Sequence, residues 1–217
     1  MTLTLYAATT NAGKLRDLAI AAAESGFAVE PLPSVAELTV PEEKEPTFEG
    51  NARLKAEYYS GLARDGALVL ADDSGLEVDA LNGAPGVRSA RYAQDAGFAP
   101  DLSRAAEMGW LGARAVDVRN NLYLLEKMRG VAQRAARYRC VLALARAGAT
   151  LCIAEGSVEG EILTSPRGKG GFGYDPLFWL PEMGRTMAEI SLEEKHTLSH
   201  RGRAFRALLP KLRQIGG

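Results

Sequence analysis

A glycine-rich segment, residues 168–176, combines backbone freedom with side chains of several chemical kinds. Four glycines fall within its first six residues, and Lys169, Phe172, Tyr174 and Asp175 stand among and after them. Glycine lets a backbone approach a ligand closely and adopt positive φ angles. Amides and a lysine suit phosphate, an aromatic ring suits a base, and a carboxylate suits a metal or a polar group. The segment therefore favours a nucleotide as its ligand.

The same segment matches the pattern G-x-G-x-x-G, but its surroundings exclude a dinucleotide-binding fingerprint. That fingerprint lies between a strand and a helix inside a βαβ unit. Here Pro176 and a short apolar run, 177–180, follow the glycines. A protein-kinase interpretation is excluded as well, because the chain contains no H-R-D or D-F-G sequence.

The turn 9–14, Thr-Thr-Asn-Ala-Gly-Lys, joins a predicted strand to a predicted helix. Free amides and the helix dipole favour anions at a helix N-terminus, and Lys14 adds a full positive charge. A Walker A loop is excluded because Ala8 stands where the first glycine belongs and Leu15 follows the lysine. Phosphate binding and an ordinary turn with a solvated lysine are both open for this turn.

Two adjacent carboxylates, Asp72 and Asp73, follow the apolar run 68–71, which is typical of a buried strand. Ligands of α/β sheets bind at the carboxyl ends of strands, and successive strand side chains point to opposite faces. We therefore expect one aspartate to face a ligand and the other to face the protein. A carboxylate facing phosphates would hold Mg²⁺ or orient a water. The structural alternative is a strand-ending turn with Ser74 as a helix cap.

Charged side chains also gather in a loop and near the last predicted helix. The loop 33–46 contains Glu42, Glu43 and Glu45, which offer a second metal ligand or form only a solvated acidic cluster. Arg201 opposes the preference of a helix N-terminus for negative groups, which indicates a nearby anion or carbonyl. His200 can donate or accept a hydrogen bond at neutral pH, whereas His196 fits a surface or capping position.

Helical and strand-like patterns alternate along the chain and predict the α/β class. Strands are predicted over 3–8, 27–32, 68–71, 138–147, 150–158 and 177–180, and helices from about 14 to 25 and over 51–62, 100–112 and 118–128, with a last helix starting near Ser199. The strands 138–147 and 150–158 are expected to form a hairpin around Gly148. We see no repeat and no linker, so residues 1–217 are predicted to form a single domain.

Composition limits the possible classes. The chain of 217 residues is 47% hydrophobic with a net charge of −1, which allows a substantial core and argues against binding to a nucleic-acid polymer. No apolar stretch approaches the roughly 20 residues of a membrane span, and the N-terminus lacks signal-peptide features. We therefore expect a cytoplasmic protein with no membrane partner. Cys140 and Cys152 lie in apolar runs and predict two buried structural thiols.

Six motifs, taken in order, resemble the Ham1/inosine triphosphate pyrophosphatase family. They are ATTNAGK (8–14), TFEGNA (47–52), ADDSGL (71–76), GAPGV with SARY (83–92), GGFGYDP (170–176) and SHRG (199–202). The resemblance extends from about residue 4 to the last helix. Two features depart from the family pattern: Gly50 stands where a glutamate often precedes the asparagine, and the segment 94–118 matches no family motif.

The resemblance implies a fold, an activity and a partner. The implied fold is an elongated mixed sheet with flanking helices and two lobes around an active-site cleft. The implied reaction is Mg²⁺-dependent hydrolysis of non-canonical purine nucleoside triphosphates, such as ITP, dITP and XTP, to the monophosphate and pyrophosphate. The family usually forms a homodimer.

The resemblance also implies roles for single residues. Asp73 would be the general base and a metal ligand, and Glu42 aligns best with the family's second metal ligand. Phe172 would be a stacking platform for the base, whose edge His200 and Arg201 would read. The other implied nucleotide-binding residues are Thr9, Thr10, Asn11, Ala12, Gly13 and Lys14 for the triphosphate, and Ser74, Gly173, Tyr174, Asp175 and Lys195.

Three alternatives are compatible with parts of this sequence. A related Maf-like pyrophosphatase would act on other modified nucleotides and would differ in its substrate profile. A noncatalytic nucleotide sensor could use the same scaffold, but it would not need Lys14 and both aspartates. A structural α/β domain without a ligand would leave the polar motifs unexplained.

Overall fold

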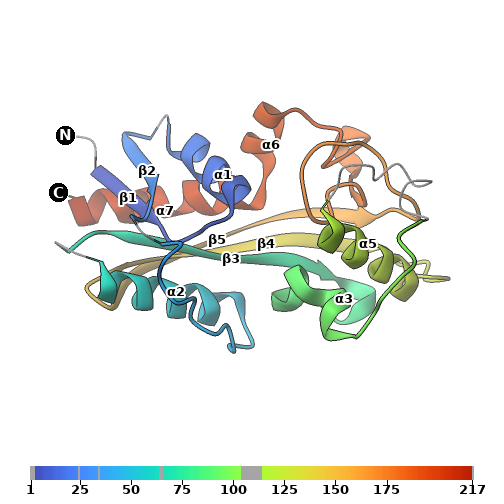
Figure 1. Cartoon of the computed structure of the whole chain (residues 1–217). Coiled ribbons are helices and arrows are strands. Elements are labelled where there is room, and N and C mark those ends of the chain that lie inside the picture. Colours follow the sequence, from blue (N-terminus) through green and yellow to red (C-terminus); the bar gives the residue numbers. More distant parts are fainter. Residues whose placement is uncertain (1–2, 24, 34, 64–65, 104–113, 217) are drawn as a thin grey trace. The chain divides into compact units, whose positions relative to one another are not determined.

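The computed structural model describes residues 3–23, 25–33, 35–63, 66–103 and 114–216. Within these residues the strands form a seven-stranded sheet in the order β2-β1-β3-β4-β5-β6-β7 (Figure 1). The strand β1 is parallel to β2 and β3, whereas β6 is antiparallel to β5 and β7. The predicted α/β class with a mixed sheet and flanking helices is confirmed.

The elements have the following bounds. The strands are β1 (Leu3–Ala7), β2 (Phe27–Pro31), β3 (Val69–Val78), β4 (Ala135–Arg146), β5 (Ala149–Ile162), β6 (Phe178–Leu180) and β7 (Arg185–Thr186). The helices are α1 (Ala12–Ala22), α2 (Phe48–Leu62), α3 (Tyr92–Asp95), α5 (Ala115–Lys127), α6 (Leu192–Leu198) and α7 (His200–Gly216). Short 3₁₀ helices are η1 (Asp79–Leu81), η2 (Gly86–Arg91) and η3 (Pro181–Met183). Of the predicted helix 100–112, residues 104–112 lie outside the described residues.

The strand β3 corrects one prediction. It continues through Asp72, Asp73 and Ser74 to Val78, so the aspartates lie inside a strand and not at its end. The polar side chains remain in the strand because other elements supply partners for both carboxylates. Gly75 of the same strand lets the backbone at Gly86 approach closely, since a Cβ atom at Gly75 would lie 2.4 Å from the carbonyl oxygen of Gly86.

The chain folds as two compact units that are each assembled from distant segments. The first unit contains Met1–Ser74, Arg139–Ser157 and His196–Gly217, and the second contains Gly75–Tyr138 and Val158–Lys195. The strands β3, β4 and β5 each contribute residues to both units. The prediction of a single domain stays a prediction.

In the first unit, α1 and α7 cover one side of the strands and α2 covers the other (Figure 1). Apolar side chains of α1, α7 and the strands form its core, with Leu5, Leu18, Leu70, Leu142, Leu144, Phe205, Leu208 and Leu212 almost fully buried. The helix α7 begins where predicted, because the Ser199 hydroxyl accepts a hydrogen bond from the Gly202 amide at 3.1 Å. Gly156 of β5 lets this helix approach closely, since a Cβ atom there would lie 2.3 Å from the Ala204 nitrogen.

The second unit has its own core. Its buried apolar residues include Leu76, Val78, Leu124, Met128, Tyr138, Val158, Ile162, Leu177, Phe178 and Met187. The rings of Tyr138 and Phe178 lie 4.5 Å apart between centroids. Tyr174 of the glycine-rich segment belongs to this core.

Two smaller predictions can be compared with the structure. The hairpin between β4 and β5 is confirmed, with Ala147 and Gly148 both at positive φ in the two-residue turn. Cys140 is fully buried, and burial raises the pKa of its thiol to about 12. Cys152 is only partly buried, so the prediction of two buried thiols is wrong for this residue. Among the described helices, none has the length and apolar character needed to cross a bilayer.

Candidate active site

The two aspartates of β3 point to opposite faces of the strand and have different partners. Asp72 receives the Lys14 ammonium of α1, with Nζ 2.9 Å from Oδ2. Asp73 receives the Lys55 ammonium of α2, with Nζ 3.1 Å from Oδ1. The expected alternation is therefore present, but each carboxylate contacts a cation.

Arg201 is the second cation beside Asp72. It is buried at the start of α7, and its Nε lies 3.4 Å from Asp72 Oδ2. Its two terminal nitrogens donate to Asp17 at 3.1 Å and to the Ser74 hydroxyl at 2.8 Å. One guanidinium thus connects α1, β3 and α7 within the first unit. Its predecessor His200 is buried as the first residue of α7.

The carboxyl group of Asp73 lies among residues of α2 and the preceding loop. Asn51 Nδ2 donates to Asp73 Oδ2 at 3.3 Å, and Lys55 bridges Asp73 to Glu43, whose Oε1 lies 2.8 Å from Nζ. Asn51 also receives the Glu45 amide on its Oδ1 at 3.1 Å, which attaches the acidic loop to the helix. The site therefore contains two carboxylates, Glu43 and Asp73, that share one ammonium.

The surroundings give the two aspartates opposite protonation behaviour. Burial alone would raise the pKa of Asp72, but Lys14 and Arg201 outweigh it and hold the pKa well below its usual range. Burial also raises the pKa of Asp73, Lys55 opposes the rise, and Glu43 adds to it, so that the pKa stays above its usual value. Asp72 is a permanent anion at neutral pH, whereas Asp73 binds a proton more readily.

The turn 9–14 forms a capped helix N-terminus. Asn11 Oδ1 accepts the amides of Gly13 at 2.9 Å and Lys14 at 3.2 Å, and the Thr9 hydroxyl accepts the Asn11 amide at 3.2 Å. Thr10 and Ala12 are exposed at the same turn. The contacts of Asp72 and Ser74 described above bring together Lys14 of this turn and Arg201 of α7.

The second unit contains the predicted base-binding residues, and Asp175 organises them. Its buried carboxylate accepts the Phe172 amide at 2.9 Å, the Tyr138 hydroxyl at 3.2 Å and the ammonium of Lys195. Gly171 has a φ of 73°, and a Cβ atom there would lie 2.0 Å from Asp175 Oδ2, so only glycine fits. These contacts close the segment 171–175 into a tight turn.

Two aromatic residues extend from this turn in different ways. The half-buried Phe172 ring lies 5.1 Å from the Lys195 ammonium, measured to the ring centroid. Tyr174 is buried and donates its hydroxyl to the Ser89 carbonyl at 2.8 Å. Gly173 separates the two residues at a φ of 62°. The structure thus brings Phe172, Tyr174, Asp175 and Lys195 together, with Phe172 as the more exposed ring. Lys169 is exposed on the approach to this turn.

The predicted metal ligand Glu42 does not share the contacts of Asp73 and Glu43 with Lys55. It is exposed and forms an ion pair with Lys44 at 2.7 Å, whereas its neighbour Glu43 reaches Lys55. In the described parts of the chain, no three His, Cys, Asp or Glu side chains are placed to hold a metal ion together. The role of Glu42 stays a prediction.

Sequence reasoning missed Asn51 and Lys55 as partners of Asp73, and Asp17 as a partner of Arg201. The spacing of four between Asn51 and Lys55 places both side chains on one face of α2. The available signal was the position of these two polar residues on the same helical stripe as the apolar residues Ala52, Ala56 and Tyr59. Asp17 lies one turn after the capped N-terminus of α1 and has no comparable local signal.

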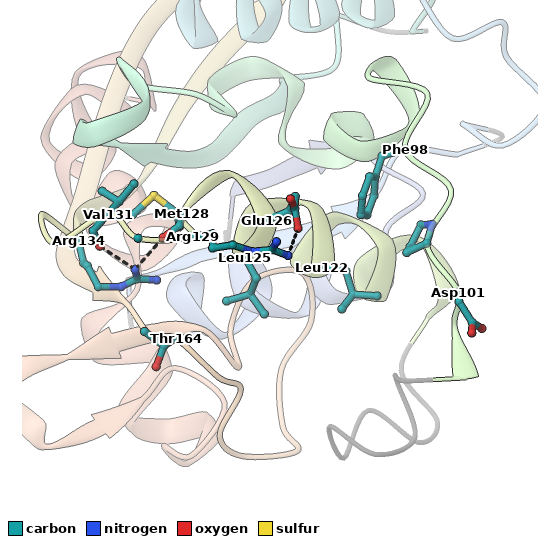
Figure 2. Close-up of a pocket in the computed structure, with 12 residues that line it drawn as sticks. Phe98, Asp101, Leu122, Leu125, Glu126, Met128, Arg129, Val131, Arg134 and Thr164 are labelled. Atoms are coloured by element: carbon teal, nitrogen blue, oxygen red, sulfur yellow. Dashed lines mark hydrogen bonds and ion pairs between the residues drawn. The ribbon is translucent and has the colours of Figure 1, made fainter.

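A cavity of about 610 Å³ lies elsewhere in the second unit (Figure 2). Leu122 and Leu125 of α5 line it together with Met128, Phe98 and Arg134. The Arg134 guanidinium donates to backbone carbonyls, including that of Leu163 at 2.9 Å. None of the residues predicted to bind a nucleotide lines this cavity.

An α/β fold with a capped helix N-terminus, two cations and paired buried carboxylates is typical of proteins that bind phosphorylated ligands. A family model described as the Ham1 family matches residues 5–211. The chain therefore belongs to the Ham1 family.

Individual relatives cover nearly the whole chain. A dITP/XTP pyrophosphatase of Acidobacterium capsulatum is 57% identical over 212 residues, which are 98% of this chain and 99% of that protein. A dITP/XTP pyrophosphatase of Thermus thermophilus is 48% identical, over 93% of this chain and 88% of that protein. The solved structure of the Staphylococcus aureus Ham1 protein matches with a TM-score of 0.77 and 34% identity, over 98% of this chain and 99% of that one.

Proposed function

We propose that this protein is an enzyme that hydrolyses non-canonical purine nucleoside triphosphates, including ITP, dITP and XTP, to the monophosphate and pyrophosphate. The observation that carries the proposal is the pair of buried aspartates of β3, of which Asp72 contacts Lys14 and Arg201, while Asp73, on the other face of the strand, contacts Lys55 and Asn51. The nearly full-length similarity to dITP/XTP pyrophosphatases supports the substrate class.

The first unit supplies the groups that phosphoryl chemistry requires. Hydrolysis at phosphorus depends mainly on positioning and on neutralising charge. We assign triphosphate binding to the turn 9–14, with Lys14 as its cation, and we assign the general base to Asp73. Its raised pKa makes the carboxylate a better proton acceptor from water than an ordinary aspartate.

Magnesium fits the chemistry of this site. Asp73 and Glu43 already converge on the positive charge of Lys55, at 3.1 and 2.8 Å. Mg²⁺ prefers oxygen ligands, and it is usually held by one or two carboxylates together with substrate phosphates and waters. We therefore propose Asp73 and Glu43 as the side chains that would hold it. When bound, the ion would neutralise charge on the phosphates.

We assign purine recognition to the second unit. Phe172 would stack on the base, while Gly173 and Tyr174 shape the turn that presents it. Asp175 supports this turn by accepting the Phe172 amide, and Lys195 supports it through its ion pair with Asp175. A direct contact of Lys195 with the nucleotide stays a prediction.

The resemblance implies that His200 and Arg201 read the edge of the base, where the 6-keto group would be the feature to recognise. A hydrogen-bond donor at that position would favour hypoxanthine and xanthine over adenine, because an unpaired polar group in a site is costly. In the structure the Arg201 guanidinium contacts Asp17, Asp72 and Ser74. These contacts favour a role for Arg201 in supporting Asp72, and base reading stays a prediction.

Two further proposals rest on the family resemblance. We propose that the protein acts in the cytoplasm, where free nucleotides are found, and that it forms a homodimer. Sedimentation velocity of the purified protein at several concentrations tests the second proposal, and a single monomeric species throughout would contradict it.

The proposed reaction is tested with a panel of ITP, dITP, XTP, GTP and ATP, each incubated with the protein and Mg²⁺ while pyrophosphate and phosphate are measured separately. We expect pyrophosphate from the first three, little from ATP, and loss of activity on addition of EDTA. Asp73→Asn is expected to abolish turnover and to leave nucleotide binding measurable, because the shape of the side chain is kept.

Each contrary result has a distinct meaning. No pyrophosphate from ITP, dITP or XTP would refute the proposed function, and a preference for other modified nucleotides would favour a Maf-like activity. Nucleotide binding without hydrolysis would indicate a sensor. Orthophosphate with a diphosphate product would place the attack on the γ-phosphate. Full activity of Asp73→Asn would remove this residue from the role of base.

A further inference from the structure

Two adjacent asparagines, Asn120 and Asn121, are buried in the middle of α5. Asparagine is a poor helix former because its side chain competes for backbone hydrogen bonds. A buried amide also needs partners for its donors and its acceptor. The contacts of these two side chains therefore indicate why polar residues occupy a buried face of this helix.

Asn120 holds the segment of η2 and α3. Its Nδ2 donates to the carbonyls of Ser89 and Ala90 at 3.2 and 3.1 Å, and its Oδ1 accepts the Ala93 amide at 2.9 Å. The Tyr174 hydroxyl donates to the same Ser89 carbonyl. Asn120 thus fixes the Ser89 carbonyl, which accepts the hydrogen bond from Tyr174 of the base-binding turn.

Asn121 contacts the base-binding turn directly. Its Nδ2 donates at 2.8 Å to the carbonyl of Gly173, between Phe172 and Tyr174, and at 2.8 Å to the Asp117 carbonyl of its own helix. Its Oδ1 is buried and has no hydrogen-bond partner among the described residues. A buried unpaired acceptor lowers stability, so stability alone does not explain an asparagine at this position.

We propose that Asn121 is a positioning residue for purine binding. This inference rests on the proposed function of the turn 171–175. Asp175, which is paired with Lys195, holds the Phe172 amide, and the Asn121 amide holds the carbonyl of the next residue, Gly173, which belongs to the peptide that joins Gly173 to Tyr174. Because Gly173 has wide conformational freedom, loss of this bond lets the peptide between Gly173 and Tyr174 rotate, and the shape of the turn that presents the Phe172 ring is then less well fixed.

The proposal predicts different effects on the binding of the purine and on the binding of the phosphates. A defect in the turn weakens contacts with the purine and leaves contacts with phosphate unchanged. The test uses Asn121→Leu, which removes the amide donor and the unpaired acceptor while keeping a similar side-chain size. Arg119→Ala, at an exposed position of the same helix, is the matched control.

Five quantities are measured for each variant: KM and kcat with dITP, the inhibition constants for dIMP and for inorganic tripolyphosphate, and the melting temperature. For Asn121→Leu we expect KM for dITP and the dIMP constant to rise about three- to tenfold, the range expected for one neutral hydrogen bond. The tripolyphosphate constant and kcat should stay within about twofold. Arg119→Ala should resemble the wild-type protein in all five measurements.

Several outcomes would overturn the proposal. One is an unchanged KM and dIMP constant, and another is an equal weakening of dIMP and tripolyphosphate, which would indicate a general structural defect. If Asn121→Leu does not fold, Asn121→Asp keeps the shape and places a carboxylate oxygen against the Gly173 carbonyl, so the same selective loss of dIMP binding is expected.

Failure of the proposed function is recognised separately. A wild-type protein that releases no pyrophosphate from ITP, dITP or XTP would refute that function. Binding of dIMP and tripolyphosphate measured by calorimetry would still test Asn121. No measurable dIMP binding by the wild-type protein would overturn the inference about Asn121 as well.

Discussion

At the scale of single residues, Asp72 and Asp73 show how neighbours divide two identical side chains into different roles. They are adjacent in sequence and both are buried. Lys14 and Arg201 surround Asp72, whereas Lys55, Asn51 and Glu43 surround Asp73. Removing the charge of Asp72 would leave Arg201 buried with a weaker counter-charge, and the resulting loss of folding stability can be measured.

Asp72→Asn is predicted to destabilise the folded protein by about 3 kcal/mol at pH 7, as is typical when one partner of a buried ion pair is removed. The lowered pKa of Asp72 means that its contribution is present above the unfolded-state pKa and is lost as the pH falls toward the folded-state pKa. The difference from the wild-type protein in urea unfolding should therefore shrink below about pH 4.

The matched control is Asp17→Asn, which removes another Arg201 contact and leaves the Lys14–Asp72 pair intact. We expect a smaller loss for this variant. A difference below about 1 kcal/mol for Asp72→Asn at pH 7, the usual size for an exposed pair, would contradict the view that this carboxylate supports two cations.

At the scale of elements, the helix α2 and the acidic loop before it act together. Thr47 caps the helix by accepting the Gly50 amide at 3.1 Å, and Asn51 holds the loop at Glu45. Gly50 lies in the first turn of α2. A Cβ atom there would lie 2.7 Å from the Glu45 Cβ, so this glycine gives the loop room to approach the helix.

Gly50→Ala is predicted to displace the loop that carries Glu43 and to lower kcat with dITP several-fold. Alanine normally stabilises a helix by up to about 1 kcal/mol relative to glycine, but the clash with Glu45 offsets this gain. Gly61→Ala in the same helix is the control, because its nearest non-neighbouring atom would lie 3.7 Å away. We expect Gly61→Ala to keep full activity and to raise the melting temperature. Equal effects of the two substitutions would refute the explanation.

At the scale of the whole molecule, both units depend on segments that are far apart along the chain. The first unit is completed only by α7, whose Phe205, Leu208 and Leu212 are fully buried. Each of these side chains contributes about 2–5 kcal/mol when buried, which is comparable in sum to the whole stability of a typical domain. The N-terminal 198 residues are therefore not expected to fold alone.

A chain truncated after Leu198 is predicted to show no cooperative thermal transition by circular dichroism. A chain truncated after Arg213 keeps the three buried side chains and should melt close to the full-length protein. A cooperative transition in the shorter chain would show that α7 is dispensable for folding.

Local patterns in the sequence were sufficient for the elements and for the family. Apolar runs predicted β1, the β4–β5 hairpin and α7, and the ordered motifs predicted the turn 9–14, the aspartate pair and the glycine-rich turn. These features depend on residues near one another in the chain, such as Ser199 capping α7 and glycines at positive φ. The run of polar residues after Ala71 misled the strand prediction, because their partners lie in other elements.

The partners of the buried charges emerged only from the tertiary structure. Arg201 contacts Ser74 across 127 residues, and Asn121 contacts Gly173 across 52. No local periodicity encodes such pairs, because a hydrogen bond depends on where two distant side chains meet in space. For the same reason, the residue types indicated a site of acidic and basic groups, whereas packing decided which aspartate has a lowered pKa and which has a raised pKa.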